Sequence, residues 1–214
     1  MKQAVNRLPV FFSHATMSLL PLTENSIMFS DVFLFLINIA FSLLGIALIV
    51  RAWIYAIRLH PFNPYVQSIL RLTDWMIHPL RKIIPPGNRA DWASIIGAWV
   101  VAFLYLLASW VVYTGQIPAP QMLLPALVAA IFTGLKWALN VVLWATLIQA
   151  ILSWVNPMAP VMPVLQTLTA PLLDPLRRIM PNLGGIDLSP LALLLLAQVG
   201  IMVLQQISFS LFGI

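Results

Sequence analysis

The sequence lacks cysteine and is poor in charge. Without cysteine the chain has no disulfide, no thiol redox centre and no thiolate metal site. Only 8% of its residues are charged and 61% are hydrophobic, whereas a soluble domain carries about 25% charged residues. So few charges cannot cover a surface that faces water. The sequence therefore predicts an integral membrane protein.

The excess of cations does not indicate a nucleic-acid partner. Eleven Lys and Arg stand against six acidic residues, but these cations lie at the ends of apolar runs and not in one hydrophilic region. Cations in that position are typical of topology signals and of contacts with lipid headgroups. Residues 1–26 lack the unbroken apolar core of a signal peptide. We expect a retained tail there, with a position in the membrane interface as one interpretation.

Four uncharged windows are long enough to cross a bilayer, which takes about 20 apolar residues in a helix. They cover residues 32–50, 92–113, 137–155 and 188–214. The stretch 117–155 contains a single charge, Lys136, and is too long for one upright helix. Two alternatives follow: a strongly tilted third span, or a separate short helix over residues 118–135. If the span begins at Lys136, this side chain lies at the outer interface and can snorkel.

The loop charges predict an orientation. The two long loops, 60–91 and 156–187, contain arginines, whereas the hairpin between the second and third spans has no charge. Short cytoplasmic loops are enriched in Lys and Arg. We therefore expect both long loops on the cytoplasmic side of the membrane and both termini outside.

The chain contains an internal repeat. A shift of 96 residues aligns 61–91 with 157–187 without a gap, and ten of the 31 aligned positions are identical. Each copy consists of a span, a loop and a span, so the copies are parallel. We expect an all-α integral membrane fold with four transmembrane helices in two parallel repeats, each loop holding a short, proline-broken amphipathic segment. The boundaries are 27–115 and 136–214, joined by 116–135.

The second copy carries a recognisable motif. The segments "SWVNPMAP" and "LTAPLLDPLRRIMPNLGGIDLSP" resemble the YggT family of small multipass bacterial membrane proteins, and the resemblance covers about residues 30 to 210. The first copy departs from the pattern, with Asn88 and Arg89 in place of Gly184 and Gly185. The resemblance implies a link to tolerance of osmotic stress and to cell-division gene neighbourhoods, and in plastid relatives to cytochrome assembly or nucleoid distribution. It implies no molecular activity for any residue.

The first loop has the pattern of an amphipathic helix. Its polar residues fall on one stripe at steps of three and four: Gln67, Arg71, Asp74, His78 and Arg81. Such a helix lies in the headgroup region, and Pro79 should kink or restart it. In the second loop Pro171 and Pro175 predict two short helices. The candidates for contact with anionic lipid or a partner are Arg71, Arg81, Lys82, Arg177 and Arg178.

A second group of residues should hold each loop against the next span. Arg81 and Asp91 recur as Arg177 and Asp187 with the same separation, so we expect an ion pair in both copies. The remaining candidates follow from helix and turn chemistry: Ser189 as helix cap, Pro190 as first helical residue, and Gly184 and Gly185 in a tight turn. A structural role is the preferred interpretation, and a ligand or partner site is the alternative.

Arg51 is the candidate for a charge within the membrane. It follows the first apolar window, ten residues before Pro61. The preferred interpretation is that its side chain snorkels to the headgroups. The alternative is that it faces a polar cavity between the spans.

The sequence contains no pattern of an enzyme site. It has no Gly-rich phosphate loop, paired-carboxylate site, nucleophile–base set or metal-ligand spacing. We expect no catalysis, no cofactor and no metal. The first hypothesis is a non-catalytic protein whose cytoplasmic loops contact anionic lipid, a membrane-protein partner or a second copy. The second hypothesis is a small oligomeric channel or transporter for ions or solutes.

Overall fold

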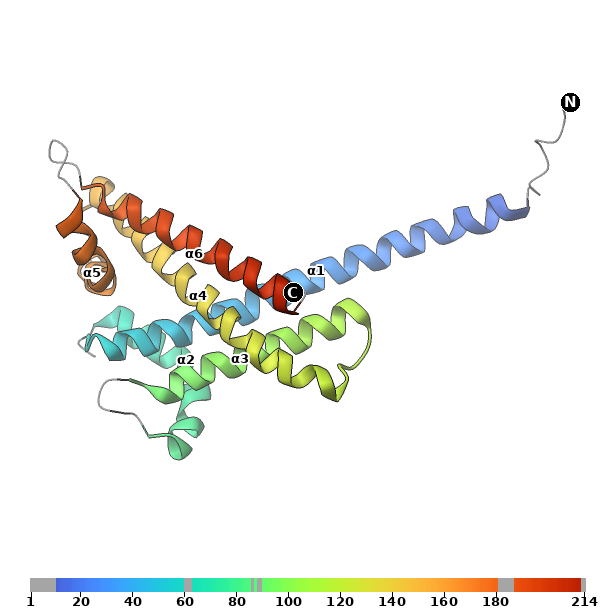
Figure 1. Cartoon of the computed structure of the whole chain (residues 1–214), viewed down its shortest axis with the longest axis horizontal. Coiled ribbons are helices and arrows are strands. Elements are labelled where there is room, and N and C mark those ends of the chain that lie inside the picture. Colours follow the sequence, from blue (N-terminus) through green and yellow to red (C-terminus); the bar gives the residue numbers. More distant parts are fainter. Residues whose placement is uncertain (1–10, 60–62, 86, 88–89, 181–186, 213–214) are drawn as a thin grey trace, which may run out of the picture.

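A computed structural model describes residues 11–59, 63–85, 87, 90–180 and 187–212, with the side chains of residues 31–210 among them. This part of the chain forms six helices and no strand (Figure 1). The helices are α1 (Phe11–Ala56), α2 (Pro64–Ile83), α3 (Trp92–Thr114), α4 (Pro120–Val155), α5 (Met162–Ile179) and α6 (Ser189–Phe212).

Four of these helices are long and apolar enough to cross a membrane. They are α1 from Asp31 onward, α3, α4 and α6 up to Ser210. Large apolar side chains lie exposed along all four, as expected of surfaces that face lipid. The prediction of a multipass, all-α membrane protein is therefore confirmed.

The helices are arranged as two parallel repeats. Within the repeats α1 packs on α3 and α4 packs on α6, and the repeats meet where α4 contacts α1 and α3. Figure 1 shows α2 and α5 at the same end of the bundle, with the α3–α4 hairpin toward the opposite end. We call these the loop-helix end and the hairpin end. The side of the membrane that each end faces stays a prediction.

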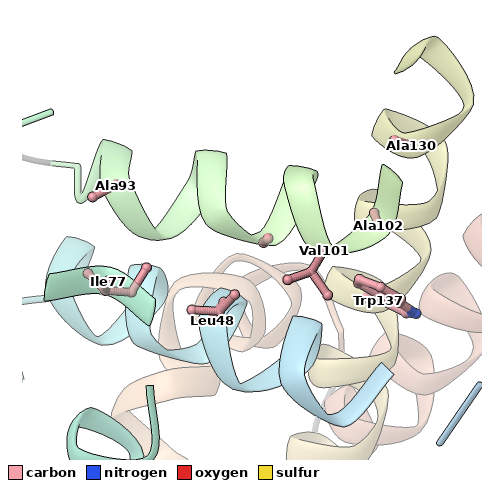
Figure 2. Packing of buried hydrophobic residues seen from close by; sticks show 8 residues of the cluster. Leu48, Ile77, Ala93, Val101, Ala102, Ala130 and Trp137 are labelled. Atoms are coloured by element: carbon pink, nitrogen blue, oxygen red, sulfur yellow. The ribbon is translucent and has the colours of Figure 1, made fainter. Parts of the chain in front are cut away.

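The hydrophobic core shows the same internal repeat as the sequence. Leu48, Ile77 and Val101 bring α1, α2 and α3 together, and Trp137 adds α4 (Figure 2). Ile77 and its repeat equivalent Leu173 are both fully buried. Each loop helix therefore anchors itself to its own spans through the same position.

The two repeats are joined by a close contact between α1 and α4. Gly45 is buried on α1, and a Cβ atom placed there would overlap the ring of Trp137. Glycine lets the large indole ring approach the backbone of α1. This contact fixes the distance between the two repeats.

The structure excludes one of the two alternatives for the third span, the separate short helix. α4 is a single helix of 36 residues, about 54 Å long, so residues 118–135 do not form a separate helix. Pro120 occupies the first turn, where its missing amide N–H costs nothing. The Trp99 indole of α3 donates a hydrogen bond to the carbonyl of Leu127 at 3.0 Å. This contact supports the early part of α4 that the sequence suggested was broken.

The expectation of two short helices in the second loop is wrong. α5 runs through Pro171 and Pro175 as one helix, and α2 runs through Pro79 without restarting. Both α5 prolines lie on the exposed face, where the carbonyls that lose a helical N–H can be hydrated. The opposite face buries Leu168 and Leu173, and this packing offsets the local cost of the prolines.

The N-terminal segment is not a separate element over most of its length. Residues 11–30 continue α1 in one helix with the first span, and Figure 1 shows this part extending away from the bundle on the hairpin side. Residues 11–26 of the expected tail are therefore helical and continuous with the first span, and residues 1–10 lie outside the described residues. The position of the tail in the membrane interface stays a prediction.

Candidate functional site: the loop helices

The loop helices begin and end at defined signals. At the start of α2 the Asn63 side chain accepts a hydrogen bond from the Tyr65 amide at 3.0 Å, and Pro64 is the first helical residue. α2 ends at Ile83 and α5 at Ile179, which are equivalent in the repeat. Each helix has a basic pair in its last turn, where cations interact favourably with the helix dipole.

The structure divides the five candidate lipid-contact cations into two groups. Arg71, Lys82 and Arg178 are exposed and have no ion-pair partner among the described residues. Arg81 and Arg177 instead turn toward aspartates. The first three side chains are therefore available to a ligand at the loop-helix end.

Apolar side chains share this exposed surface. Leu72, Trp75 and Ile83 lie on α2 with their side chains largely exposed, Trp75 at 69%. Ile179 repeats this feature on α5. A helix surface that mixes exposed cations with exposed tryptophan and aliphatic groups is typical of the headgroup region of a bilayer.

In the first repeat the expected ion pair is present and buried. Arg81 Nη2 lies 2.6 Å from Asp91 Oδ2, and Asp91 is 0% exposed. The Ser94 hydroxyl donates to the same carboxylate oxygen at 2.8 Å. Asp91 therefore connects the end of α2 to the first turn of α3. The loop-holding role of these residues stays a prediction.

Arg51 does not snorkel, so the preferred interpretation of this residue is wrong. Its side chain is 2% exposed and points between α1 and the loop of its own repeat. Nη1 donates to the Leu70 carbonyl at 3.1 Å, to Thr73 Oγ1 at 2.7 Å and to Asp74 Oδ1 at 2.8 Å. The Arg51 guanidinium is therefore bound by groups of α2 and not by lipid headgroups.

We call the buried residues Arg51, Thr73, Asp91 and Ser94, together with their partners Arg81 (35% exposed) and Asp74 (57% exposed) at the edge, the buried charge cluster. Arg51 Nε lies 3.8 Å from Asp91 Oδ2, so both arginines face one aspartate. Three buried polar atoms of the cluster have no hydrogen-bond partner: Arg51 Nε, Arg81 Nε and Asp91 Oδ1. Thr73 and Ser94 were not predicted from the sequence, and Asp74 was placed only on the polar stripe of the first loop. Thr73 had a signal of its own, because it recurs as Thr169.

The second repeat keeps the ion pair in an exposed setting. Arg177 Nε lies 2.9 Å from Asp187 Oδ2, and the two side chains are 44% and 40% exposed. A second, longer contact of 3.4 Å joins Arg177 to Asp174. The structure has no arginine at the position equivalent to Arg51. Instead, the buried Thr169 hydroxyl donates to Gln149 of α4.

Asp187, and not Ser189, provides the side-chain cap of α6. Asp187 Oδ1 accepts the Ser189 amide N–H at 2.9 Å, and α6 already begins at Ser189, so Pro190 is the second helical residue. Partial burial raises the pKa of Asp187, but hydrogen bonds from Ser189 and the Arg177 guanidinium outweigh it and leave the pKa below its ordinary value. Gly184 and Gly185 lie outside the described residues.

Comparisons with known proteins agree with the repeat. The profile of the CCB3/YggT family matches twice, over residues 30–112 and 128–208. The chain is 34% identical to "Uncharacterized protein YggT" of Escherichia coli K12 over 167 residues, which are 77% of this chain and 85% of that protein. It is 35% identical to "Uncharacterized protein in proC 3'region" of Vibrio alginolyticus over 161 residues, 74% of this chain and 85% of that protein. No solved structure matches. The chain therefore belongs to the CCB3/YggT family.

Proposed function

We propose that this protein is a non-catalytic membrane protein of the bacterial inner membrane that acts through its loop helices. In this proposal α2 and α5 lie in the cytoplasmic headgroup region and bind anionic lipid. The observation that carries the proposal is the position of α2 and α5 at one end of the bundle, with exposed cations beside exposed apolar groups. The family resemblance suggests tolerance of osmotic stress, or assembly related to the envelope and to division, as the cellular setting.

The packing of the loop helices supports this proposal. Each one is fixed by a fully buried side chain, Ile77 or Leu173, and by an arginine–aspartate pair at its end. A surface that is fixed in this way presents its cations without a further ordering cost. Each cation near an anionic surface contributes about 1 kcal/mol of binding free energy.

The test replaces the three exposed, unpaired cations. In the variant with Arg71→Gln, Lys82→Gln and Arg178→Gln, the number of phosphatidylglycerol molecules retained in native mass spectrometry should fall, while membrane insertion and phosphatidylcholine binding stay unchanged. Gln166→Ala is the matched control, because Gln166 is exposed on α5 and uncharged. Unchanged lipid selectivity would favour a membrane-protein partner at this surface.

A second measurement tests the orientation. Cysteine labels placed at positions 88 and 184 should both be protected from a reagent that cannot cross the membrane. One protected and one reactive label would contradict the parallel repeats as well as the cytoplasmic position of the loops.

The second candidate function is a small oligomeric channel or transporter. The buried charge cluster favours it, because ionisable residues inside a membrane protein often mark a path for ions. Flux of salt through liposomes that contain the purified protein tests this alternative. The flux should be absent under the first proposal and should depend on Arg51 and Asp91 under the second.

A further inference from the structure

A cavity of about 650 Å³ lies at the hairpin end, away from the loop helices. It is enclosed by the C-terminal half of α3, the first half of α4 and one residue of α6. The polar groups that line it are Tyr105, Ser109, Tyr113, Thr114, Gln121, Thr133, Lys136 and Ser208. Its size is that of a pocket for a small organic molecule, which takes about 300–1,000 Å³. A lone inorganic ion would leave most of it unfilled.

The cavity holds one cation and no acid. Lys136 lines it, is half-buried and has no ion-pair partner among the described residues. Every other unpaired lysine or arginine whose side chain the structure describes is exposed. A buried ammonium group is costly in a membrane unless an anion accompanies it. No acidic side chain of the described residues neutralises Lys136, so a bound anion would supply its counter-charge.

The hydroxyl of Ser208 is also without a partner. Ser208 of α6 is 3% exposed and lines the same cavity as Lys136, and no hydrogen bond to its side chain occurs within the described part of the chain. The ring of Tyr105 contacts Trp137, the neighbour of Lys136, at a centroid distance of 6.0 Å. Tyr105, Lys136 and Ser208 therefore contribute donors of three chemical kinds to one cavity, from α3, α4 and α6.

Apolar side chains share the lining with these polar groups. Leu106, Trp110, Met122, Pro125 and Ala126 form an apolar wall on α3 and α4. Exposed apolar residues flank it on α4, among them Leu124 and Val128, so the cavity adjoins the surface that faces lipid. A cation with hydroxyl donors and an apolar wall in the same cavity suit a molecule with an anionic head and a hydrocarbon tail.

We propose that this cavity binds an anionic amphiphile from the membrane, with a phosphate or carboxylate head at Lys136 and an acyl chain against Leu106, Trp110 and Met122. Lys136 pairs with the head, and Ser208 and Tyr105 donate hydrogen bonds to it.

The experiment uses the full chain in an uncharged detergent and three probes. Dodecyl phosphate has both head and chain, dodecanol has the chain alone, and butyl phosphate has the head with a short chain. We expect dodecyl phosphate to bind most tightly and to raise the melting temperature. Lys136→Gln should weaken it by roughly 10- to 100-fold, as expected for the loss of a hydrogen-bonded charge. Lys136→Arg should retain most of the binding.

Two further variants keep the inference falsifiable. Ala126→Leu fills the cavity but leaves the cation, and it should weaken dodecyl phosphate without affecting butyl phosphate. In the triple variant with Arg71→Gln, Lys82→Gln and Arg178→Gln, the loss of dodecyl phosphate binding caused by Lys136→Gln should persist, so failure of the loop-helix proposal is distinguishable. Equal binding by Lys136→Gln and the wild type would overturn the inference. So would equal affinity for butyl and dodecyl phosphate, because the ligand would then not be a membrane amphiphile.

Discussion

The two repeats hold the same arginine–aspartate pair in opposite surroundings. Arg81 and Asp91 lie in a buried cluster with Arg51, whereas Arg177 and Asp187 are both largely exposed. The residues that differ are the surrounding ones, since Leu147 and Ala170 stand where the first repeat has Arg51 and Asp74. One duplicated contact has therefore become part of the interior in one copy and has stayed at the surface in the other.

The same arginine–aspartate pair therefore contributes differently to stability in the two repeats. A surface ion pair contributes about 0–1 kcal/mol, while the loss of one partner from a buried pair costs about 3–5 kcal/mol. The first repeat should therefore depend on its aspartate far more than the second.

The largest effect is expected for Asp91→Asn. This change leaves Arg51 and Arg81 facing each other without their shared counter-charge, and the free energy of unfolding should fall by roughly 3 kcal/mol. Asp187→Asn, at the equivalent position, should cost less than about 1 kcal/mol. Chemical unfolding of both variants in detergent measures the difference. Equal losses would show that burial does not distinguish the repeats.

Gly45→Ala should have the next largest effect. The added methyl group would overlap the Trp137 ring, so the two repeats must separate, at a cost of about 1–3 kcal/mol. The second repeat has Val141 at the equivalent position. Gly134→Ala on α4 is the matched control, since no atom lies within 4 Å of its added methyl group. A loss of stability in both variants would point to the helices themselves and not to the contact.

The spans and the repeat could be predicted from the sequence, because both follow from local rules. The thickness of the hydrocarbon core sets the length of an apolar window, and a gapless shift shows the duplication directly. The ion pairs at Asp91 and Asp187 followed from the repeat as well. Their burial did not, because it depends on which side chains arrive from α1.

The errors occurred where tertiary packing outweighed a local preference. Arg51 was assigned to the headgroups, but its partners lie 19 to 23 residues away in the chain. Pro171 and Pro175 predicted a break, but the burial of Leu168 and Leu173 keeps α5 in one piece. In both cases the decisive contact lies in another helix, and no pattern within the segment reveals it.

The double variant with Arg51→Leu and Asp74→Ala gives the first repeat the residues that the second repeat has at these two positions. It removes the charge that lies between α1 and α2 while Arg81 keeps Asp91. Because the Asp74 side chain is 57% exposed and the variant leaves no unpaired buried charge behind, the loss of stability should stay below about 1.5 kcal/mol. A loss as large as that of Asp91→Asn would mean that Arg51, and not Asp91, organises the buried charge cluster.

The smallest effect is expected from acidification of the second repeat. The pKa of Asp187 lies below its ordinary value, so its ion pair stabilises the folded state above the unfolded pKa of about 3.9. This contribution is lost as the pH falls through the folded pKa. The melting temperature of the wild type should therefore exceed that of Asp187→Asn slightly at pH 7, and the difference should vanish as the pH falls below about 4. Because Asp187 is 40% exposed, solvent screening keeps the difference small. A difference that grows on acidification would contradict the assignment, because it would require a folded pKa raised above the unfolded value.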